Sequence, residues 1–288
     1  MSEFIAENEN EFNVSIATSA LGISRATFYR YKNKQPTQTE VRREEIRKQV
    51  LDIYKSSEGR YGAPKILQVL NNQRDDTVGI KLVQKLMAEE KIQSVIVKKH
   101  RANKAGNPVP ERMNLLERNF KTNGLNEKWV GDITYIHTEN DGWTYLATFM
   151  DLHSRRIVGY AYGKYMTDNL VMNAFGNAML NRDVPASLIV HTDLGAQFTG
   201  LEFETLLQQV GAQHSYSHKA NPYDNAVIEA FHATYKKEEL YVNKNHYKTF
   251  KQARRFVFDY IERWYNRVRI HGSIGNVSPA EFEATLMS

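Results

Sequence analysis

WVGDITYIHT (residues 129–138) is followed, after the polar turn ENDG (139–142), by WTYLATFMDL (143–152). Both runs are rich in β-branched and aromatic side chains, which favour strands, so the stretch predicts an antiparallel hairpin. RRIVGYAYG (155–163) adds a third strand of the same composition. Three consecutive strands joined by short turns predict an antiparallel half of a larger sheet.

Downstream of this hairpin, helical and strand patterns alternate. The expected order is a helix at 167–180, the strand SLIVHTD, the helix LEFETLLQQV, the strand QHSYSH and helices at 223–240 and 248–268. Alternating elements after an antiparallel hairpin are typical of a mixed sheet covered by helices. The class is therefore α/β, with a five-stranded sheet flanked by helices.

Upstream, residues 13–33 predict two short helices around a tight turn. Ile16, Ala17 and Ala20 would form an apolar stripe on the first, and Ser24 is a good N-cap for the second. The second helix would bury Phe28 and expose four side chains suited to a major groove, namely Arg25, Thr27, Tyr29 and Arg30. The pattern predicts a helix-turn-helix, although a helical hairpin with no DNA role has the same pattern.

Between this hairpin and the sheet lie a second helical unit and a connector. Apolar residues at helical spacing predict three helices within 40–92. From Lys91 to Lys128 there are nine Lys and Arg residues with little periodicity, which fits either a segment along a phosphate backbone or a solvated linker. The expected domains are 1–36, 37–95, a linker at 96–124, a core at 125–270 and a C-terminal tail at 271–288.

Composition excludes several classes of site. The 288 residues contain no cysteine, which excludes disulfides, thiolate nucleophiles and cysteine-bound metals, and no apolar run is long enough for a membrane span. The acidic start lacks a secretory signal, so a cytosolic protein is expected. Residues 1–130 carry 23 Lys and Arg against 16 Asp and Glu, which suits a polyanionic partner such as DNA or is simply an ordinary surface.

Three acidic residues stand in apolar surroundings. Asp132 interrupts the first strand, Asp193 ends the strand LIVHTD, and Glu229 lies within the apolar helix segment AVIEAF. A charge in such a setting requires a cation or strong hydrogen bonds. A pair of Mg²⁺ ions would satisfy all three and would serve phosphoryl transfer, whereas structural acids paired with Lys or Arg are the alternative.

The sequence resembles the OrfB-type transposases of bacterial insertion sequences, in the retroviral integrase superfamily. The matching stretches are NEKWVGDITYI, VHTDLGAQF, ANPYDNAVIEAFHATYKKE and YIERWYNRVRIHGSIGNVSPAEF. Asp193 and Glu229 are separated by 35 residues, a spacing that marks this family. The likeness extends upstream through ISRATFYRYKNK and GRYGAPKIL, so it covers nearly the whole chain.

This resemblance implies a ribonuclease-H-like catalytic domain in which Asp132, Asp193 and Glu229 bind two Mg²⁺ ions, with Mn²⁺ as a substitute. Asp151 is the best decoy for Asp132, and the motif match decides against it. Supporting roles near the acids are expected for His191, Gln197 and Asn225. Lys236, seven residues beyond Glu229, would touch DNA near the cut, and basic residues interleaved with aromatics suggest further DNA contacts at Arg267 and Arg269.

The implied reaction is metal-dependent strand cleavage followed by attack of the freed 3′-OH on another phosphodiester. The implied partners are double-stranded DNA, both terminal inverted repeats and target, further copies of the chain on DNA and a protein from an upstream reading frame. The expected location is the cytoplasm, on the nucleoid when DNA is bound, with no membrane partner. A plain nuclease with the same core and a non-catalytic DNA-binding regulator are the alternative readings.

Overall fold

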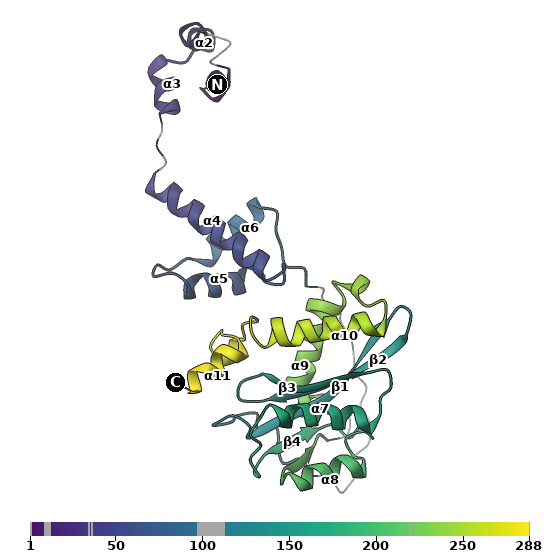
Figure 1. The fold of residues 1–288 in the computed structure, drawn as a ribbon. Helices are drawn as coiled ribbons and strands as arrows, with labels where there is room; N and C mark the ends of the chain where they lie inside the picture. The colour runs from purple at the N-terminus through teal and green to yellow at the C-terminus, as the bar shows by residue number, and fades with distance from the viewer. Residues whose placement is uncertain are drawn as a thin grey trace.

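The computed structural model describes residues 2–8, 13–33, 35, 37–96, 113–218 and 221–287. Figure 1 shows three successive parts: small helices at the N-terminus, a second helical unit, and a larger domain built on a sheet. Part of the expected basic linker, residues 97–112, lies outside the described residues. None of the described helices combines the length and apolar character needed to cross a membrane.

The N-terminal part contains α1 (Ser2–Glu7), α2 (Val14–Ala20) and α3 (Arg25–Lys32). As expected, Ser24 caps α3 by accepting a hydrogen bond from the backbone N–H of Thr27 at 3.0 Å, and Phe28 is fully buried. The expected apolar stripe on α2 is wrong, because Ile16 is 71% exposed. The core instead takes Thr18 from α2 and Ile5 from α1, a helix that the sequence pattern did not reveal.

The second helical unit consists of α4 (Gln38–Ser56), α5 (Ala63–Asn72) and α6 (Ile80–Glu89). α4 begins with a capping box in which Thr37 and Glu40 satisfy each other's backbone N–H groups. The expected apolar positions form the core of the unit, with Ile46, Val50, Ile66, Leu70, Val83 and Leu86 fully buried.

The sheet has five strands in the order β3-β2-β1-β4-β5. β1 (Lys128–Thr138) pairs antiparallel with β2 (Gly142–Asp151), which pairs antiparallel with β3 (Ile157–Gly163). β4 (Ile189–Thr192) lies parallel to β1, and β5 (Gln213–Tyr216) lies parallel to β4. This mixed order is the expected ribonuclease-H-like arrangement.

Helices cover both faces of the sheet, as Figure 1 shows. On one face, α7 (Asp168–Leu180) and α8 (Leu201–Gln209) pack over the sheet, where Phe175 of α7 contacts the buried rings of Trp129 and Phe149. α7 comes so close to β3 that a Cβ atom on Gly159 would lie 2.3 Å from the carbonyl oxygen of Ala174. The other face is covered by α9 (Ala226–Tyr235) and α10 (Phe250–Phe258), with short 3-10 segments at η1 (Pro222–Asn225) and η3 (Lys244–His246).

Two helices expected to be regular end in π-helical segments, η2 (Lys236–Leu240) after α9 and η4 (Asp259–Tyr265) after α10. The wider turn of a π-helix accommodates one more residue than an α-helical turn. In η2 this places both Glu238 and Glu239 in buried contacts. Glu238 accepts from Arg269, whereas Glu239 accepts from Arg60 of the helical unit at 2.8 Å. The π segment therefore joins the helical unit to the α9 helix.

The expected C-terminal tail contains η5 (Gly272–Ile274) and the helix α11 (Pro279–Met287). Ser278 and Glu281 form a reciprocal cap at its start, and the sequence SPAE carries this capping pattern with proline at the first helical position. Glu283 then pairs with Arg156 and Arg182 at 2.7 and 2.6 Å. These ion pairs fix α11 to the sheet domain.

The described end of the connector also packs on this domain. The backbone N–H groups of Leu115 and Leu116 donate to the hydroxyl of Ser215, and the N–H of Tyr216 donates to the carbonyl of Met113. Leu116 is buried. Residues 113–116 therefore belong structurally to the β5 side of the sheet, although the sequence placed them in the basic linker.

Candidate active site

The sheet brings two of the three expected acids to the same edge. β1 and β4 are adjacent and parallel, and Val130 lies opposite His191 in their register. Asp132 and Asp193 each follow one of these partners by two residues, so both lie where the two strands separate. α9 packs on β1 and carries Glu229 in its first turn.

The contacts of the acids are few. Asp132 accepts a hydrogen bond from the backbone N–H of Ile133 at 2.8 Å, and Asp193 accepts one from the N–H of Gly195 at 3.0 Å. Glu229 is exposed on α9. Across the described chain, no Lys or Arg side chain forms an ion pair with any of these acids. The alternative of structural acids neutralised by basic neighbours therefore finds no support.

The electrostatics show that the three acids are neighbours. Partial removal from water raises the pKa of Asp193, and the negative charge of Asp132 raises it further. The pKa of Glu229 is raised by the same loss of water and then by the charges of Asp132 and Asp193. Asp193 and Glu229 still reach solvent, so they are only partly dehydrated. A site in which neighbouring negative charges raise the pKa of Asp193 and of Glu229 is one that a cation would stabilise.

The donor chemistry fits a hard divalent cation, although the side chains are not closed into a ready cage. Among the described residues, no group of three His, Asp or Glu side chains is close enough together to hold a metal ion. Asn225, at the start of α9, donates to the carbonyl of Gly131 at 3.0 Å, and its own Oδ1 atom is buried with no hydrogen-bond partner. Carboxylate and amide oxygens are suitable direct or water-mediated partners for Mg²⁺.

Two of the expected supporting residues are held by other contacts. His191 is fully buried between the hydroxyls of Ser215 and Ser217, at 2.8 and 3.0 Å, and burial lowers its pKa to about 4. It therefore joins β4 to the β5 side as a neutral ring. Gln197 donates to the carbonyl of Met166 at 3.3 Å, which fixes the loop after Asp193.

Asp151, the decoy, has a structural role. Its buried carboxylate accepts hydrogen bonds from the backbone N–H groups of Asn126 and His153, both at 2.7 Å. It closes the turn between β2 and β3, and in the strand register it lies opposite Trp129, three residues before Asp132 on β1. The structure therefore gives no reason to include Asp151 among the site residues.

His232 is a site residue that the sequence did not reveal. Its Nδ1 atom lies 3.2 Å from Oδ2 of Asp132, and its Nε2 atom lies 2.9 Å from the hydroxyl of Thr148. The side chain is nearly buried. The only available signal is a polar ring three residues beyond Glu229 on an otherwise apolar helix, which does not identify a partner 100 residues away.

The residues expected to touch DNA fall into three groups. On α3, Arg25, Tyr29 and Arg30 are exposed and Thr27 is half-buried, as a recognition surface requires. Lys236 begins η2 and borders a cavity beside β1, whereas Arg267 is exposed after η4.

Arg269 does not fit the expected role. Its side chain is only 13% exposed, and its guanidinium donates to both carboxylate oxygens of Glu238 at 3.0 Å. A phosphate could not bind this guanidinium, because it is largely buried and its N–H groups already bond to Glu238. Arg269 therefore fixes η2 to the segment after η4, and we exclude it from the DNA surface.

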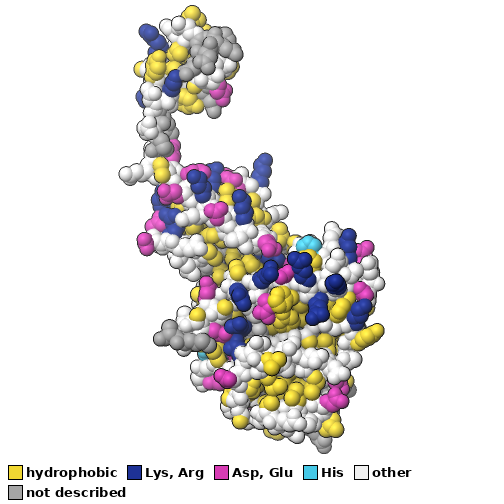
Figure 2. All heavy atoms as spheres, viewed as in Figure 1, with side chains coloured by type: hydrophobic (Ala, Val, Ile, Leu, Met, Phe, Trp, Pro, Cys, Tyr) yellow, Lys and Arg dark blue, Asp and Glu magenta, His cyan; other side chains and the backbone are white. Residues whose placement is uncertain are grey.

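A basic face lies on the outer side of α10 and η4. Figure 2 shows Lys and Arg side chains gathered beside the junction with the helical unit. The exposed members along these two segments are Lys251, Arg254, Arg255 and Arg263, and Arg267 follows directly after η4. Such a face suits a polyanion.

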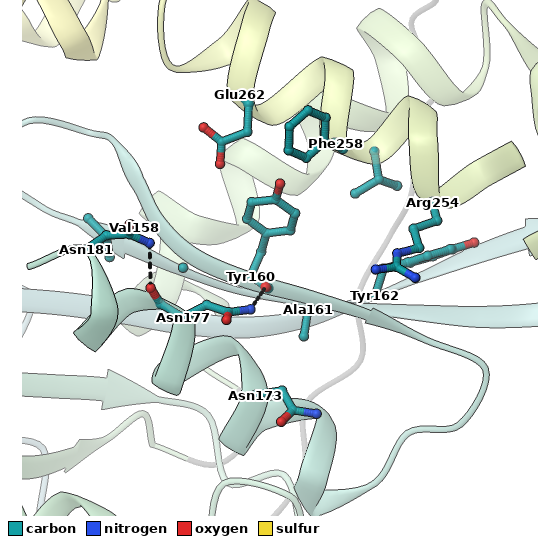
Figure 3. A pocket seen from close by; sticks show the side chains of 12 residues that line it. Val158, Tyr160, Ala161, Tyr162, Asn173, Asn177, Asn181, Arg254, Phe258 and Glu262 are labelled. Carbon is teal, nitrogen blue, oxygen red and sulfur yellow. Dashed lines mark hydrogen bonds between the residues drawn. The ribbon is translucent and has the colours of Figure 1, made fainter. Parts of the chain in front are cut away.

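A separate cavity of about 480 Å³ lies at the free edge of β3, between α7 and α10 (Figure 3). Asn177 donates to the carbonyl of Tyr160 at 3.0 Å and so covers part of the strand edge. Arg254 and Glu262 approach from the opposite side in the same view. None of the three acids lines this cavity, so it is distinct from the candidate active site.

Family models match most of the chain. Residues 123–222 and 210–279 each match a model described as integrase core domain, and residues 41–100 match one described as HTH-like domain. The HTH-like match thus falls on the second helical unit, α4 to α6. The most similar solved structures include the HTLV-2 integrase catalytic core domain in complex with magnesium, at 16% identity and TM-score 0.43 over 56% of this chain and 99% of that one.

Two curated relatives align along almost their full length. The transposase for insertion sequence element IS904 of Lactococcus lactis is 38% identical over 87% of this chain and 98% of its own. Transposase InsF for insertion sequence IS3A of Escherichia coli is 34% identical over 97% of each chain. This chain therefore belongs to the insertion-sequence transposases that carry an integrase core domain.

Proposed function

We propose that this chain cleaves DNA strands at the ends of an insertion sequence and joins the freed 3′-OH to another phosphodiester, with two Mg²⁺ ions held by Asp132, Asp193 and Glu229. The observation that supports this most is that Asp132 and Asp193, where β1 and β4 separate, and Glu229 on α9 interact through their charges, with no Lys or Arg counter-ion among the described residues. When bound, such ions, or Mn²⁺ in their place, activate the attacking oxygen and stabilise the leaving one.

The chain's own groups would then have separate tasks. Asp132, whose charge acts on both other acids, would be shared between the two ions, and His232 would hold its carboxylate in place. Asn225 would fix the start of α9 to β1 by its hydrogen bond to the carbonyl of Gly131. Lys236 would touch the phosphate backbone near the cut. No covalent bond between protein and DNA is needed, because water and the 3′-OH are the nucleophiles.

DNA recognition would be divided along the chain. The exposed side chains of α3, Arg25, Thr27, Tyr29 and Arg30, would read a major groove of the terminal inverted repeat, and the α4–α6 unit would bind beside it. Target DNA would lie against the basic face that includes Arg267. Paired ends would require several copies of the chain, and a protein from an upstream reading frame would be a further partner.

The test is incubation of the protein with labelled DNA that carries the ends of its own element, with Mg²⁺ or with EDTA. We expect joined products that require Mg²⁺ and that disappear in Glu229→Gln and Asp193→Asn, while both variants still retard the DNA in a gel. Fragments without joined products would instead indicate a plain nuclease. An Asp193→Asn protein with every activity intact would indicate a non-catalytic DNA-binding protein.

A further inference from the structure

A groove with two exposed aromatic rings lies along the β1–β2 hairpin and η2, which continue the elements that carry Asp132 and Glu229. It has a volume of about 800 Å³, within the range of ligand-binding clefts. Its lining includes Tyr135, His137 and Trp143 from the β1–β2 hairpin and Lys236, Tyr241 and Lys244 from η2 and the segment after it. We call it the Trp143 groove.

The aromatic side of the groove is a ladder across the hairpin. Tyr135 pairs with Tyr145 and His137 pairs with Trp143 in the strand register. The Trp143 ring stands edge-on to His137 and to Tyr135, with centroids 5.0 and 6.3 Å apart. Trp143 is 59% exposed and Tyr135 is 48% exposed. Fixed rings with solvent-facing surfaces, rather than rings packed in a core, are what a stacking ligand requires.

The groove begins at the elements that carry the acids. Tyr135 follows Asp132 by three residues on β1, a distance of about 10 Å along a strand. Lys236 follows Glu229 by seven residues, about 10 Å along a helix. Side chains alternate along a strand, so the Tyr135 ring faces the opposite side of the sheet from Asp132, and a DNA strand at the acids would reach the groove around the edge of β1 beyond Val130, where β4 no longer pairs with it.

The chemistry of the groove favours an unpaired strand. Lys236 and Lys244 supply two ammonium groups against the single carboxylate of Glu139, so the lining is net basic. Aromatic rings stack on base faces, which a continuous duplex keeps covered by neighbouring bases. We propose that the Trp143 groove binds one or two unstacked nucleotides of the DNA strand beside the cut. That the bound nucleotides lie beside the cut rests on the proposed function, whereas the binding test below does not require cleavage or joining.

The test measures strand binding in EDTA, where cleavage and joining do not occur. The probes are a (dT)15 single strand and a 15-base-pair duplex. Trp143 is a built-in reporter because Trp129 and Trp264, the other two tryptophans, are 0% and 7% exposed. We expect (dT)15, more than the duplex, to protect tryptophan fluorescence from quenching by acrylamide.

The variant Trp143→Leu should weaken (dT)15 binding by about 5- to 150-fold, the loss of one base stack, and change duplex binding much less. The control is Tyr165→Leu, which removes a ring that is 75% exposed outside the groove. Melting temperatures of both variants should match the parent, because Trp143 is mostly in solvent. Photocrosslinking of bromodeoxyuridine-substituted (dT)15 should label the 143–145 peptide.

Equal (dT)15 affinity for Trp143→Leu and the parent would overturn the inference. So would equal losses on single strand and duplex, which would indicate backbone contact alone, or a loss of self-association in sedimentation, which would make the groove an interface between copies. Strand binding that depends on Trp143 in a protein unable to join DNA ends would support the groove and refute the proposed reaction, so the two failures are distinguishable.

Discussion

His232 is hydrogen-bonded to Asp132 on the α9 face of the sheet, with 3.2 Å between Nδ1 and Oδ2, while its Nε2 atom lies 2.9 Å from the Thr148 hydroxyl. Thr148 is the β2 partner of Asp132 in the strand register. One ring thus ties the carboxylate to two strands and to the helix that carries Glu229. This contact limits how Asp132 can rotate.

We therefore expect His232→Ala to reduce strand joining by about 10- to 100-fold, the usual loss when a residue that orients a metal-binding side chain is removed. DNA retardation in a gel should not change. His232→Asn places an amide N–H near the former Nδ1 position and should restore most of the joining. If both variants lose joining and melting temperature equally, the ring is needed only for packing.

The acids should destabilise the protein when no cation is bound. Asp193→Asn removes one negative charge from a cluster in which Asp132 raises the pKa of both Asp193 and Glu229. In EDTA, the variant should melt at a higher temperature than the parent. Added Mg²⁺ should raise the melting temperature of the parent more than that of the variant. Equal Mg²⁺ responses in the two proteins would show that Asp193 does not bind the ion.

The buried pair of Arg60 and Glu239 should contribute strongly to stability. Both side chains are at most 6% exposed, and Arg60→Met would leave the Glu239 carboxylate without its cation. We expect a loss of about 3–5 kcal/mol in urea unfolding, with much of it recovered in the double variant Arg60→Met/Glu239→Gln. Arg42→Met, which removes an exposed partner of Asp76 and leaves the Arg74 partner in place, should cost less than about 1 kcal/mol. Similar losses for the two pairs would contradict this reading.

Gly159 should not tolerate a side chain. A Cβ atom there would lie 2.3 Å from the Ala174 oxygen and 2.5 Å from the Ala178 nitrogen, both of which are backbone atoms of α7. Gly159→Ala should therefore destabilise the domain by about 1–3 kcal/mol or more. Gly176→Ala is the matched control, because its Cβ would meet nothing within 4 Å and alanine favours a helix by about 1 kcal/mol. We expect Gly159→Ala to lower the melting temperature and Gly176→Ala to raise it.

His271 should make folding sensitive to acid. Burial lowers its pKa to about 3, with a further lowering by the charge of Arg269, while an unfolded histidine has a pKa near 6.5. The folded state then binds fewer protons than the unfolded state, so stability is fully present above about pH 6.5 and declines as the pH falls toward 3.

The variant His271→Gln should show a shallower decline of unfolding free energy between about pH 6.5 and 5 than the parent. His246→Gln is the comparison, because its side chain is 45% exposed and it removes a histidine without removing a buried ring. The pH slope is compared rather than the absolute stability, since any substitution at a buried position has its own cost. Parallel pH curves for His271→Gln and the parent would contradict the prediction.

The sheet could be predicted from sequence because its strands have distinct local patterns. The β1–β2 hairpin has the expected turn, and the acids follow from motif spacing. What could not be predicted depends on contacts distant along the chain. Arg269 has the composition of a DNA contact, yet Glu238 buries it, and Ile16 suggests a core position that the short helices leave in solvent. His232 can be identified as a site residue only from the fold, which brings it to Asp132 from 100 residues away.

The wide turn at η2 has a consequence for how a DNA end would be measured. Arg60 grips Glu239 ten residues along the chain from Glu229, a distance of about 15 Å along the helix. If the α4–α6 unit binds the terminal repeat, η2 would fix the distance between the bound repeat and the three carboxylates. This junction would therefore determine the number of base pairs between the bound repeat and the nick. Weakening the contact of Arg60 with Glu239 should make the position of the nick less uniform.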